Sequence, residues 1–285
     1  MANLKEIRNR ISSVSSTMQI TSAMKMVSAA KLKKAQDAIT AMRPYSNKLT
    51  ELLQSLSATL DADSGSKFAD QREVKKVLLV AISSNRGLAG AFNSNIIKQV
   101  NTILSDYADK EVSILAIGKK VNDAFGKKGS IIANKSEVFD DLTYDNVAEI
   151  AQMIMDKFVE GDFDKVELIY NSFKNAATQI VMTEQFLPIV PIESDTNVNL
   201  DYIFEPSKQE IVETLIPKSL KTQLFKAIRD SFASEHGARM TAMHKATDNA
   251  TELRDQLKLT YNKARQAAIT NEILEIVGGA EALNH

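Results

Sequence analysis

The chain of 285 residues contains no cysteine. It can therefore form no disulfide bond, and it offers neither a thiol nucleophile nor a thiolate ligand for a metal ion. No apolar run approaches the ~20 residues that a membrane-spanning helix requires. Residues 1–10 are too charged to form the apolar core of a secretory signal. These absences predict a cytoplasmic protein of one or two domains.

Helix-breaking residues are scarce in the last eighty positions. Between Leu220 and Gly278 there is no proline, and the only glycine is Gly237. Apolar and small residues recur there at three- and four-residue spacing, as along one side of a helix. Residues 207–285 are therefore predicted to form one helix, which at ~1.5 Å per residue would be on the order of 100 Å long. A globular core cannot bury that length, so a long partner is expected.

The N-terminal segment, residues 1–60, is the expected partner. It begins with Asn3 as a helix cap, supported by Glu6 three positions later. The following apolar residues have the 3-4-3-4 spacing of a coiled-coil seam: Leu4, Ile7, Ile11, Val14 and Met18. Pro44 should kink this helix or break it locally. We expect an antiparallel coiled coil whose C-terminal helix is ~20 residues longer and projects by on the order of 30 Å.

A different periodicity begins at Glu73, after a polar linker over residues 61–72. Short apolar runs predict strands at 77–82, 112–117, 131–139, 166–173 and 178–188. Helical spacing falls between them, at 93–107, 119–128 and 144–159. This alternation predicts a Rossmann-like α/β domain over residues 73–205, with a mainly parallel sheet, inserted between the two long helices.

Charge is distributed unevenly along the chain. Residues 1–57 carry a net charge of +6, residues 58–206 a net charge of −8, and the remainder +1. A basic terminal helix and an acidic middle suggest different partners for the two regions.

The residues that could carry catalysis do not form a recognisable site. Gly87 and Gly90, in the segment Ser83–Asn93, complete neither a dinucleotide fingerprint nor a P-loop, so a packed turn is favoured over an anion site. His236 and His244 are too far apart on a helix to share a metal, and surface or seam positions are expected. Asp140 and Asp141 are expected to be a loop pair of acids. We predict no enzyme, no cofactor and no metal site.

Four segments resemble the gamma subunit of F-type ATP synthases. The terminal segments, Ile7–Lys31 (IRNRISSVSSTMQITSAMKMVSAAK) and Ile269–Ala282 (ITNEILEIVGGAEA), are similar to the signatures at the two ends of that family. Ser83–Asn95 (SSNRGLAGAFNSN) and Ser234–Ala250 (SEHGARMTAMHKATDNA) resemble two further family blocks. The resemblance covers both ends and the start of the inserted domain.

The resemblance implies a central rotating shaft. It would couple ion flow through the membrane c-ring to ATP synthesis or hydrolysis at the beta subunits, with catalysis on beta. The implied partners are three alpha and three beta subunits, the epsilon and delta subunits and the c-ring, without nucleic acid. The implied location is peripheral, on the cytoplasmic face of a bacterial plasma membrane, with membrane association only through the complex.

Specific residues match the family's contact positions. The implied contacts with the alpha–beta hexamer are Arg8, Arg10, Met24, Lys25, Arg265, Gln266, Thr270 and Glu272. An apolar bearing tip is implied at Ile273, Leu274, Ile276 and Val277. Tyr202 and Glu205 fall where the family meets the c-ring.

Two other interpretations remain open at the level of the sequence. One is a nucleotide- or anion-binding α/β enzyme with a coiled-coil dimerisation arm, which predicts a homodimer and a ligand at Ser83–Asn93. The other is a structural tether, for which an uninterrupted seam of large residues would be expected.

Overall fold

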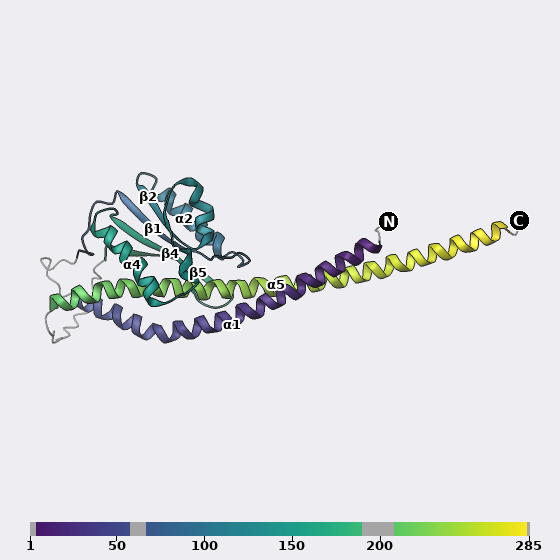
Figure 1. Ribbon diagram of the computed structural model, residues 1–285, viewed down its shortest axis with the longest axis horizontal. Coiled ribbons are helices and arrows are strands. Elements are labelled where there is room, and N and C mark those ends of the chain that lie inside the picture. The colour runs from purple at the N-terminus through teal and green to yellow at the C-terminus, as the bar shows by residue number, and fades with distance from the viewer. Residues whose placement is uncertain (1–3, 58–66, 190–207, 284–285) are drawn as a thin grey trace. The chain divides into compact units, whose positions relative to one another are not determined.

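The computed structural model describes residues 4–57, 67–189 and 208–283 (Figure 1). The chain forms two compact units, one made of Met1–Ser28 with Met240–His285 and the other of Ala29–Arg239. The first is called the coiled-coil unit below, and the second the domain unit. The division predicted from the sequence, at 1–60, 73–205 and 207–285, remains a prediction.

Two long helices contribute to both units. Helix α1 spans Leu4–Ser57 and helix α5 spans Lys208–Leu283. The sequence predicts either a kink or a local break of the helix at Pro44. The break does not occur, since α1 continues through Pro44, just as α5 continues through Pro217. A proline inside a helix removes one hydrogen bond and costs ~3 kcal/mol. Buried residues on both sides of Pro44, Ile39 and Leu49, hold the helix in place.

A five-stranded sheet lies in the domain unit, in the order β3-β2-β1-β4-β5. Its strands are β1 (Lys76–Ile82), β2 (Glu111–Ile117), β3 (Ile131–Asn134), β4 (Lys165–Phe173) and β5 (Gln179–Leu187). The first four are parallel, and β5 is antiparallel to β4. The predicted mainly parallel sheet is confirmed.

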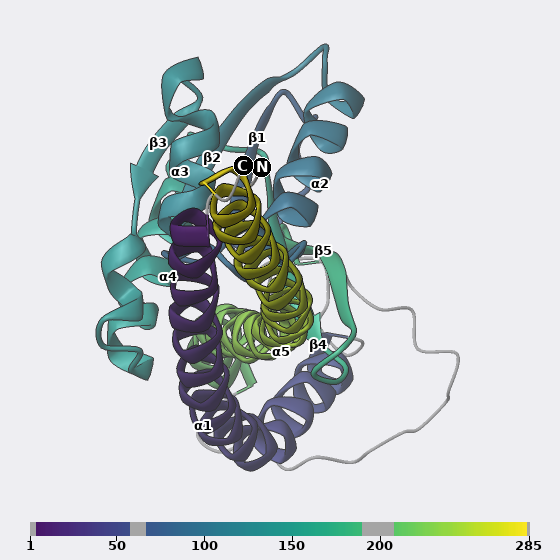
Figure 2. The same cartoon turned by 90° about the vertical axis from the view of Figure 1, so that its right-hand side faces the viewer.

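Three helices connect these strands: α2 (Phe92–Asp106), α3 (Lys119–Phe125) and α4 (Tyr144–Val159). In Figure 2, α2 and α4 lie on opposite sides of the sheet. Two predicted elements are shorter than expected, since 3₁₀ turns form at Gly126–Lys128 and Ser136–Phe139. The second turn ends the strand predicted at 131–139 and places Val138 in the core, which explains the apolar residue there.

Strand β1 is buried on both faces, as its continuous apolar run predicts. Leu78, Val80 and Ile82 belong to the core cluster that also contains side chains of α4 and α5. Leu79 and Ala81 belong to the opposite cluster, with side chains of α2 and α3. The α5 contribution to the first cluster consists of Ile216, Leu220, Leu224, Ala227 and Ile228.

Helix α5 is therefore a core helix of the α/β fold before it becomes half of a coiled coil. The sequence pattern predicts α1 as the partner of α5 and does not indicate its packing on the sheet. In the domain unit α1 also lies near α5, with Lys218 Nζ 5.9 Å from the centre of the Tyr45 ring.

Candidate functional site

The coiled-coil unit consists of two antiparallel helical segments. Arg8 Nη2 donates to the Tyr261 hydroxyl at 2.7 Å, and Lys25 Nζ lies 3.4 Å from His244 Nδ1. Residue numbers thus rise along α1 as their partners' numbers fall along α5, which confirms the antiparallel pairing. Both views of the ribbon show these segments side by side (Figures 1 and 2).

The seam between these segments is narrow and partly polar. Ile7, Met243 and Ala250 are buried in it, and so is Thr21. The Thr247 hydroxyl lies 2.8 Å from both the Thr21 hydroxyl and the Met243 carbonyl oxygen. This pair of hydroxyls fixes one relative register of the two helices, a use of buried polar groups known from coiled coils.

Beyond this seam the end of α5 has no partner within the described residues. Because Arg8 lies opposite Tyr261, the first described residue of α1, Leu4, reaches only to about position 265 of α5. Every residue from 265 to 280 is exposed. We call residues 266–283 the projecting tip, which at 1.5 Å per residue is ~27 Å long. Figure 1 shows α5 continuing past the start of α1.

The predicted bearing residues all lie on the projecting tip. Their exposed fractions are 55% for Ile273, 63% for Leu274, 66% for Ile276 and 56% for Val277. Exposed apolar patches are a common feature of surfaces that bind other molecules, so these four positions are the candidate contact surface of the tip.

The predicted hexamer contacts are also accessible. Arg265, Gln266, Thr270 and Glu272 are exposed on α5, while on α1 Arg8 and Arg10 are exposed and Met24 and Lys25 half-buried. The hydrogen bond that Arg8 donates to the Tyr261 hydroxyl raises the pKa of Arg8, so this guanidinium stays charged. The two predicted c-ring contacts, Tyr202 and Glu205, lie outside the described residues.

The segment Ser83–Asn93 is a turn whose polar groups bond to the protein itself. The Ser84 amide donates to Asn93 Oδ1 at 3.0 Å, and the Val121 amide donates to Ser83 Oγ at 3.0 Å. The Lys119 amide donates to Asn85 Oδ1. These bonds occupy groups that an anion site would need, and they favour the packed turn over the nucleotide site.

The histidines do not come together. His236, expected at a surface or seam, is buried against the Phe232 ring, with centroids 4.5 Å apart, and burial lowers its pKa to about 3. His244 is exposed beside Asp248, and His285 lies outside the described residues. Asp140 and Asp141 are both exposed, and the described part of the chain holds no cluster of metal-ligating side chains.

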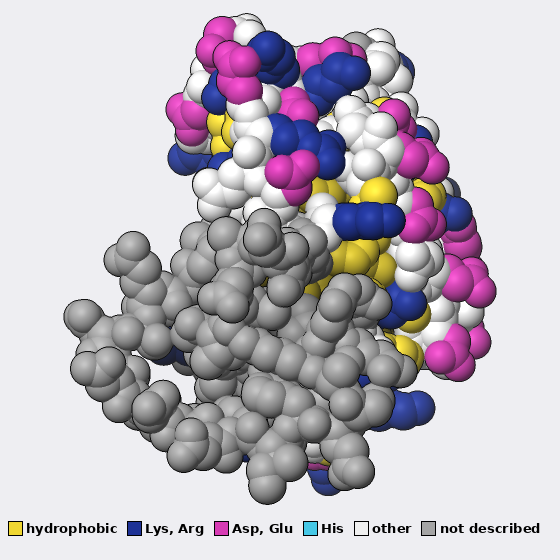
Figure 3. All heavy atoms as spheres, turned by 90° about the vertical axis from the view of Figure 1, so that its left-hand side faces the viewer, with side chains coloured by type: hydrophobic (Ala, Val, Ile, Leu, Met, Phe, Trp, Pro, Cys, Tyr) yellow, Lys and Arg dark blue, Asp and Glu magenta, His cyan; other side chains and the backbone are white. Residues whose placement is uncertain are grey.

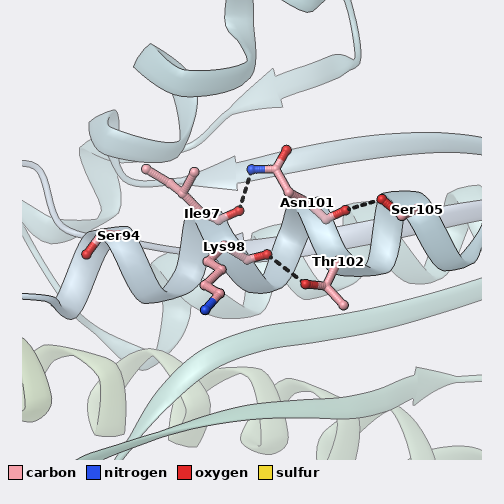
Figure 4. A pocket seen from close by; sticks show the side chains of 6 residues that line it. All are labelled: Ser94, Ile97, Lys98, Asn101, Thr102 and Ser105. Atoms are coloured by element: carbon pink, nitrogen blue, oxygen red, sulfur yellow. Dashed lines mark hydrogen bonds between the residues drawn. The ribbon is translucent and has the colours of Figure 1, made fainter.

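Surface hollows among the described residues include one on α2 and one beside α4. One, of about 480 Å³, lies along α2, where three side chains bond to the helix's own carbonyl groups (Figure 4): Asn101, Thr102 and Ser105. The other, of about 420 Å³, lies between Lys135 and Met153. On the coloured part of the face shown in Figure 3, acidic and basic side chains lie intermixed.

One cluster was missed by the sequence analysis. Glu235 and Arg239 form a buried ion pair of 2.7 Å on α5, and Arg239 also donates to the carbonyl groups of Arg86 and Gly87. Both segments were noted as separate motifs, and only the fold brings them together.

The comparisons with known proteins agree with this arrangement. Residues 3–283 match the family model described as ATP synthase. The ATP synthase gamma chain of Flavobacterium psychrophilum is 78% identical over 99% of both chains, and that of Flavobacterium johnsoniae is 73% identical over the full length of both.

Solved structures share the fold at low sequence identity. A chain in the rotor of the Euglena gracilis mitochondrial ATP synthase superposes with a TM-score of 0.68 and 21% identity, covering 93% of this chain and 98% of that one. A chain in the central stalk and c-ring structure of the Tetrahymena thermophila mitochondrial enzyme gives a TM-score of 0.60 at 23% identity, covering 80% and 99%.

The structure has an antiparallel helix pair with an uncovered apolar tip and an inserted α/β domain, and the sequence is 78% and 73% identical to two gamma chains over nearly their whole length. The chain therefore belongs to the family of ATP synthase gamma chains.

Proposed function

We propose that this chain is the central rotating shaft of an F-type ATP synthase. The observation that carries the proposal is the projecting tip, a helix end with exposed aliphatic side chains in a chain that is 78% identical to a gamma chain. A soluble protein gains nothing from exposing such a surface to water, whereas a surrounding ring of subunits would cover it.

The surface chemistry of the tip suits repeated contact with several identical partners. The four aliphatic side chains of the tip can slide against an apolar ring without fixed hydrogen bonds: Ile273, Leu274, Ile276 and Val277. Arg265 and Glu272 are exposed, and exposed ion pairs are worth only ~0–1 kcal/mol each. Such contacts can break and re-form with each third of a turn while the beta subunits pass through open, loose and tight nucleotide states.

The remaining partners follow from the family. Three alpha and three beta subunits surround the helix pair, catalysis takes place on beta, and the α/β domain faces the epsilon subunit and the c-ring, with Tyr202 and Glu205 as ring contacts. The delta subunit completes the complex. The chain is peripheral to the cytoplasmic face of a bacterial plasma membrane. No described helix is both long and apolar enough to span a bilayer.

The α/β enzyme with a dimerisation arm is not favoured. It requires a ligand at Ser83–Asn93, where the serine and asparagine groups already bond to the protein. An enzyme of this kind would also have no need for a long helix end that exposes aliphatic side chains.

Co-expression with alpha and beta subunits of a close relative tests the proposal. We expect one copy of this chain per three alpha–beta pairs, and an ATPase rate that depends on its presence. A homodimer that ignores the hexamer, and whose melting temperature rises with nucleotide, would instead support the α/β enzyme.

A further inference from the structure

A tight junction joins α5 to the α/β domain where two sequence motifs meet. One partner is the loop between β1 and α2, residues 83–91, and the other is the α5 turn from Ser234 to Arg239. Both lie within the domain unit. We call their contact the α5 junction.

Arg239 makes most of the polar contacts in the α5 junction. Its Nε and Nη2 atoms each lie 3.3 Å from the carbonyl oxygen of Gly87, and Nη2 lies 3.3 Å from that of Arg86. Its Nη1 atom contacts Glu235 Oε1 at 2.7 Å and His236 Nδ1 at 3.4 Å. One guanidinium thus holds two loop carbonyl groups and its own helix, a geometry that lysine cannot reproduce.

The side chains that α5 contributes to the junction are buried, whereas Arg86 and Gly87 of the loop are exposed. Arg239 and Glu235 are 6% and 7% exposed, and Ala238 packs against Ala89 and Phe92. On the other side of the turn, Ser234 Oγ donates to the Asn171 carbonyl oxygen at 3.0 Å. Hydrogen bonds in such a place are strong, and leaving their partners unpaired is costly.

The loop itself needs this support. Leu88 follows the two carbonyl groups that Arg239 holds and has a φ of 61°, in the left-handed region, with its side chain 63% exposed. A non-glycine residue in this conformation persists only where its surroundings enforce it. Arg239 donates to the carbonyl oxygens of Arg86 and Gly87, the two residues before Leu88, and so restrains the backbone at Leu88.

The position of Arg239 along α5 suggests why this attachment exists. It is the last residue of the domain unit, and α5 continues from Met240 into the coiled-coil unit. If torque enters at the α/β domain and is used at the far end of α5, the helix must be fastened to the domain by side chains. A fastening at the last possible turn leaves the shortest free length of helix to twist.

We propose that Arg239 is a torque-bearing positioning residue, which locks the loop at 83–91 to α5 and so stiffens the shaft at the point where it leaves the domain. This inference rests on the proposed rotary function. It assigns Arg239 no contact with nucleotide or with the reacting atoms.

The test uses the assembled complex with three variants of this chain. Arg239→Met removes the donors, Arg239→Lys keeps the charge without the fork, and Arg72→Met is the matched control. Arg72 also donates to a carbonyl oxygen, that of Phe158 at 3.1 Å, but inside the α/β domain. Because the chain has no cysteine, Ser105→Cys on the exposed face of α2 gives a single attachment site on it for a bead.

Two readouts separate a mechanical role from a merely structural one. Angular fluctuations of the bead in stalled complexes report torsional stiffness, and amide exchange at residues 84–91 reports the loop. Arg239→Met and Arg239→Lys should lose stiffness, and loop protection should fall by about tenfold to hundredfold, the loss expected for a charged hydrogen bond. Arg72→Met should leave both readouts unchanged.

The outcomes are distinguishable. Wild-type stiffness in assembled Arg239→Lys complexes, or an equal loss of stiffness in Arg72→Met, would overturn the torque-bearing role. If Arg239→Met fails to assemble, the lysine variant still decides the question. A wild-type complex that hydrolyses ATP without turning the bead would overturn the rotary function itself.

Discussion

Replacing Gly237 by alanine tests how closely α5 packs against the turn between β4 and β5, next to the α5 junction. In an ordinary helix interior, alanine is more favourable than glycine by about 0.8–1.0 kcal/mol. At this position a Cβ atom would lie 3.2 Å from the Ala176 Cα, 3.3 Å from Phe173 Cε2 and 3.4 Å from the Ala176 carbonyl oxygen. Two of these three atoms are backbone, so the turn between β4 and β5 would have to move by a few tenths of an ångström.

The expected result follows from the two opposing effects. Overpacking a close contact costs about 1–3 kcal/mol. After subtraction of the helix gain, Gly237→Ala should destabilise the chain by about 0–2 kcal/mol. The assay is chemical unfolding of the full-length chain, followed by circular dichroism.

Gly278→Ala is the matched control on the same helix. No atom lies within 4 Å of its added Cβ, so only the helix gain remains, and it should appear as slower amide exchange in the projecting tip. Stabilisation of the chain by Gly237→Ala, by the ~1 kcal/mol expected of an open helix site, would refute the argument that α5 requires glycine at this contact.

Three further predictions concern the tip and the buried histidine. Combining Arg265→Ala with Glu272→Ala should lower the number of protons pumped per ATP in reconstituted vesicles. The free energy of unfolding should change by less than about 0.5 kcal/mol, because both residues are exposed. Unchanged pumping would contradict the role of these two residues as hexamer contacts. Truncation after Gln266 should lower torque in a bead-rotation assay and leave the helix pair intact, and full torque would disprove the bearing. His236 has a pKa lowered to about 3 by burial and by the positive charges of Arg239 and Lys31. The unfolded state therefore binds the extra proton between pH ~6.5 and ~3, so stability should fall with decreasing pH in that window, by at most about 1.4 kcal/mol per pH unit. His236→Gln should remove that part of the slope in acid unfolding, and an unchanged slope would show that His236 does not titrate there.

The main elements of this fold could be predicted because their signals are local. Between Leu220 and Gly278 there is no proline and only one glycine, which predicts α5, and the run at 77–82 predicts a strand buried on both faces. The strand predicted at 131–139 was too long, since β3 ends at Asn134 and a 3₁₀ turn follows. Val138 is buried by this turn, and the spacing of apolar residues alone cannot distinguish a buried residue of a short turn from one of a strand. The unbroken helix at Pro44 likewise depends on packing that no local rule contains.

The α5 junction could not be predicted, because it depends on contacts between distant residues. Arg239 and Gly87 are separated by 152 positions, and nothing in either segment indicates that they meet. The burial of His236 was missed for the same reason, since its neighbours belong to the tertiary fold. For the projecting tip, the greater length of the second helix predicted exposure, which the structure confirms, while the roles of its residues stay predictions.

The proposal that this chain is a rotating shaft is tested most directly by observing its rotation inside an alpha–beta hexamer. The hexamer would be fixed to a surface, a bead attached at Ser105→Cys, and ATP supplied. The account predicts rotation in one direction, in thirds of a turn, that stops when ATP is removed. Continued ATP hydrolysis that depends on this chain, with a bead that only fluctuates about one angle, would contradict it.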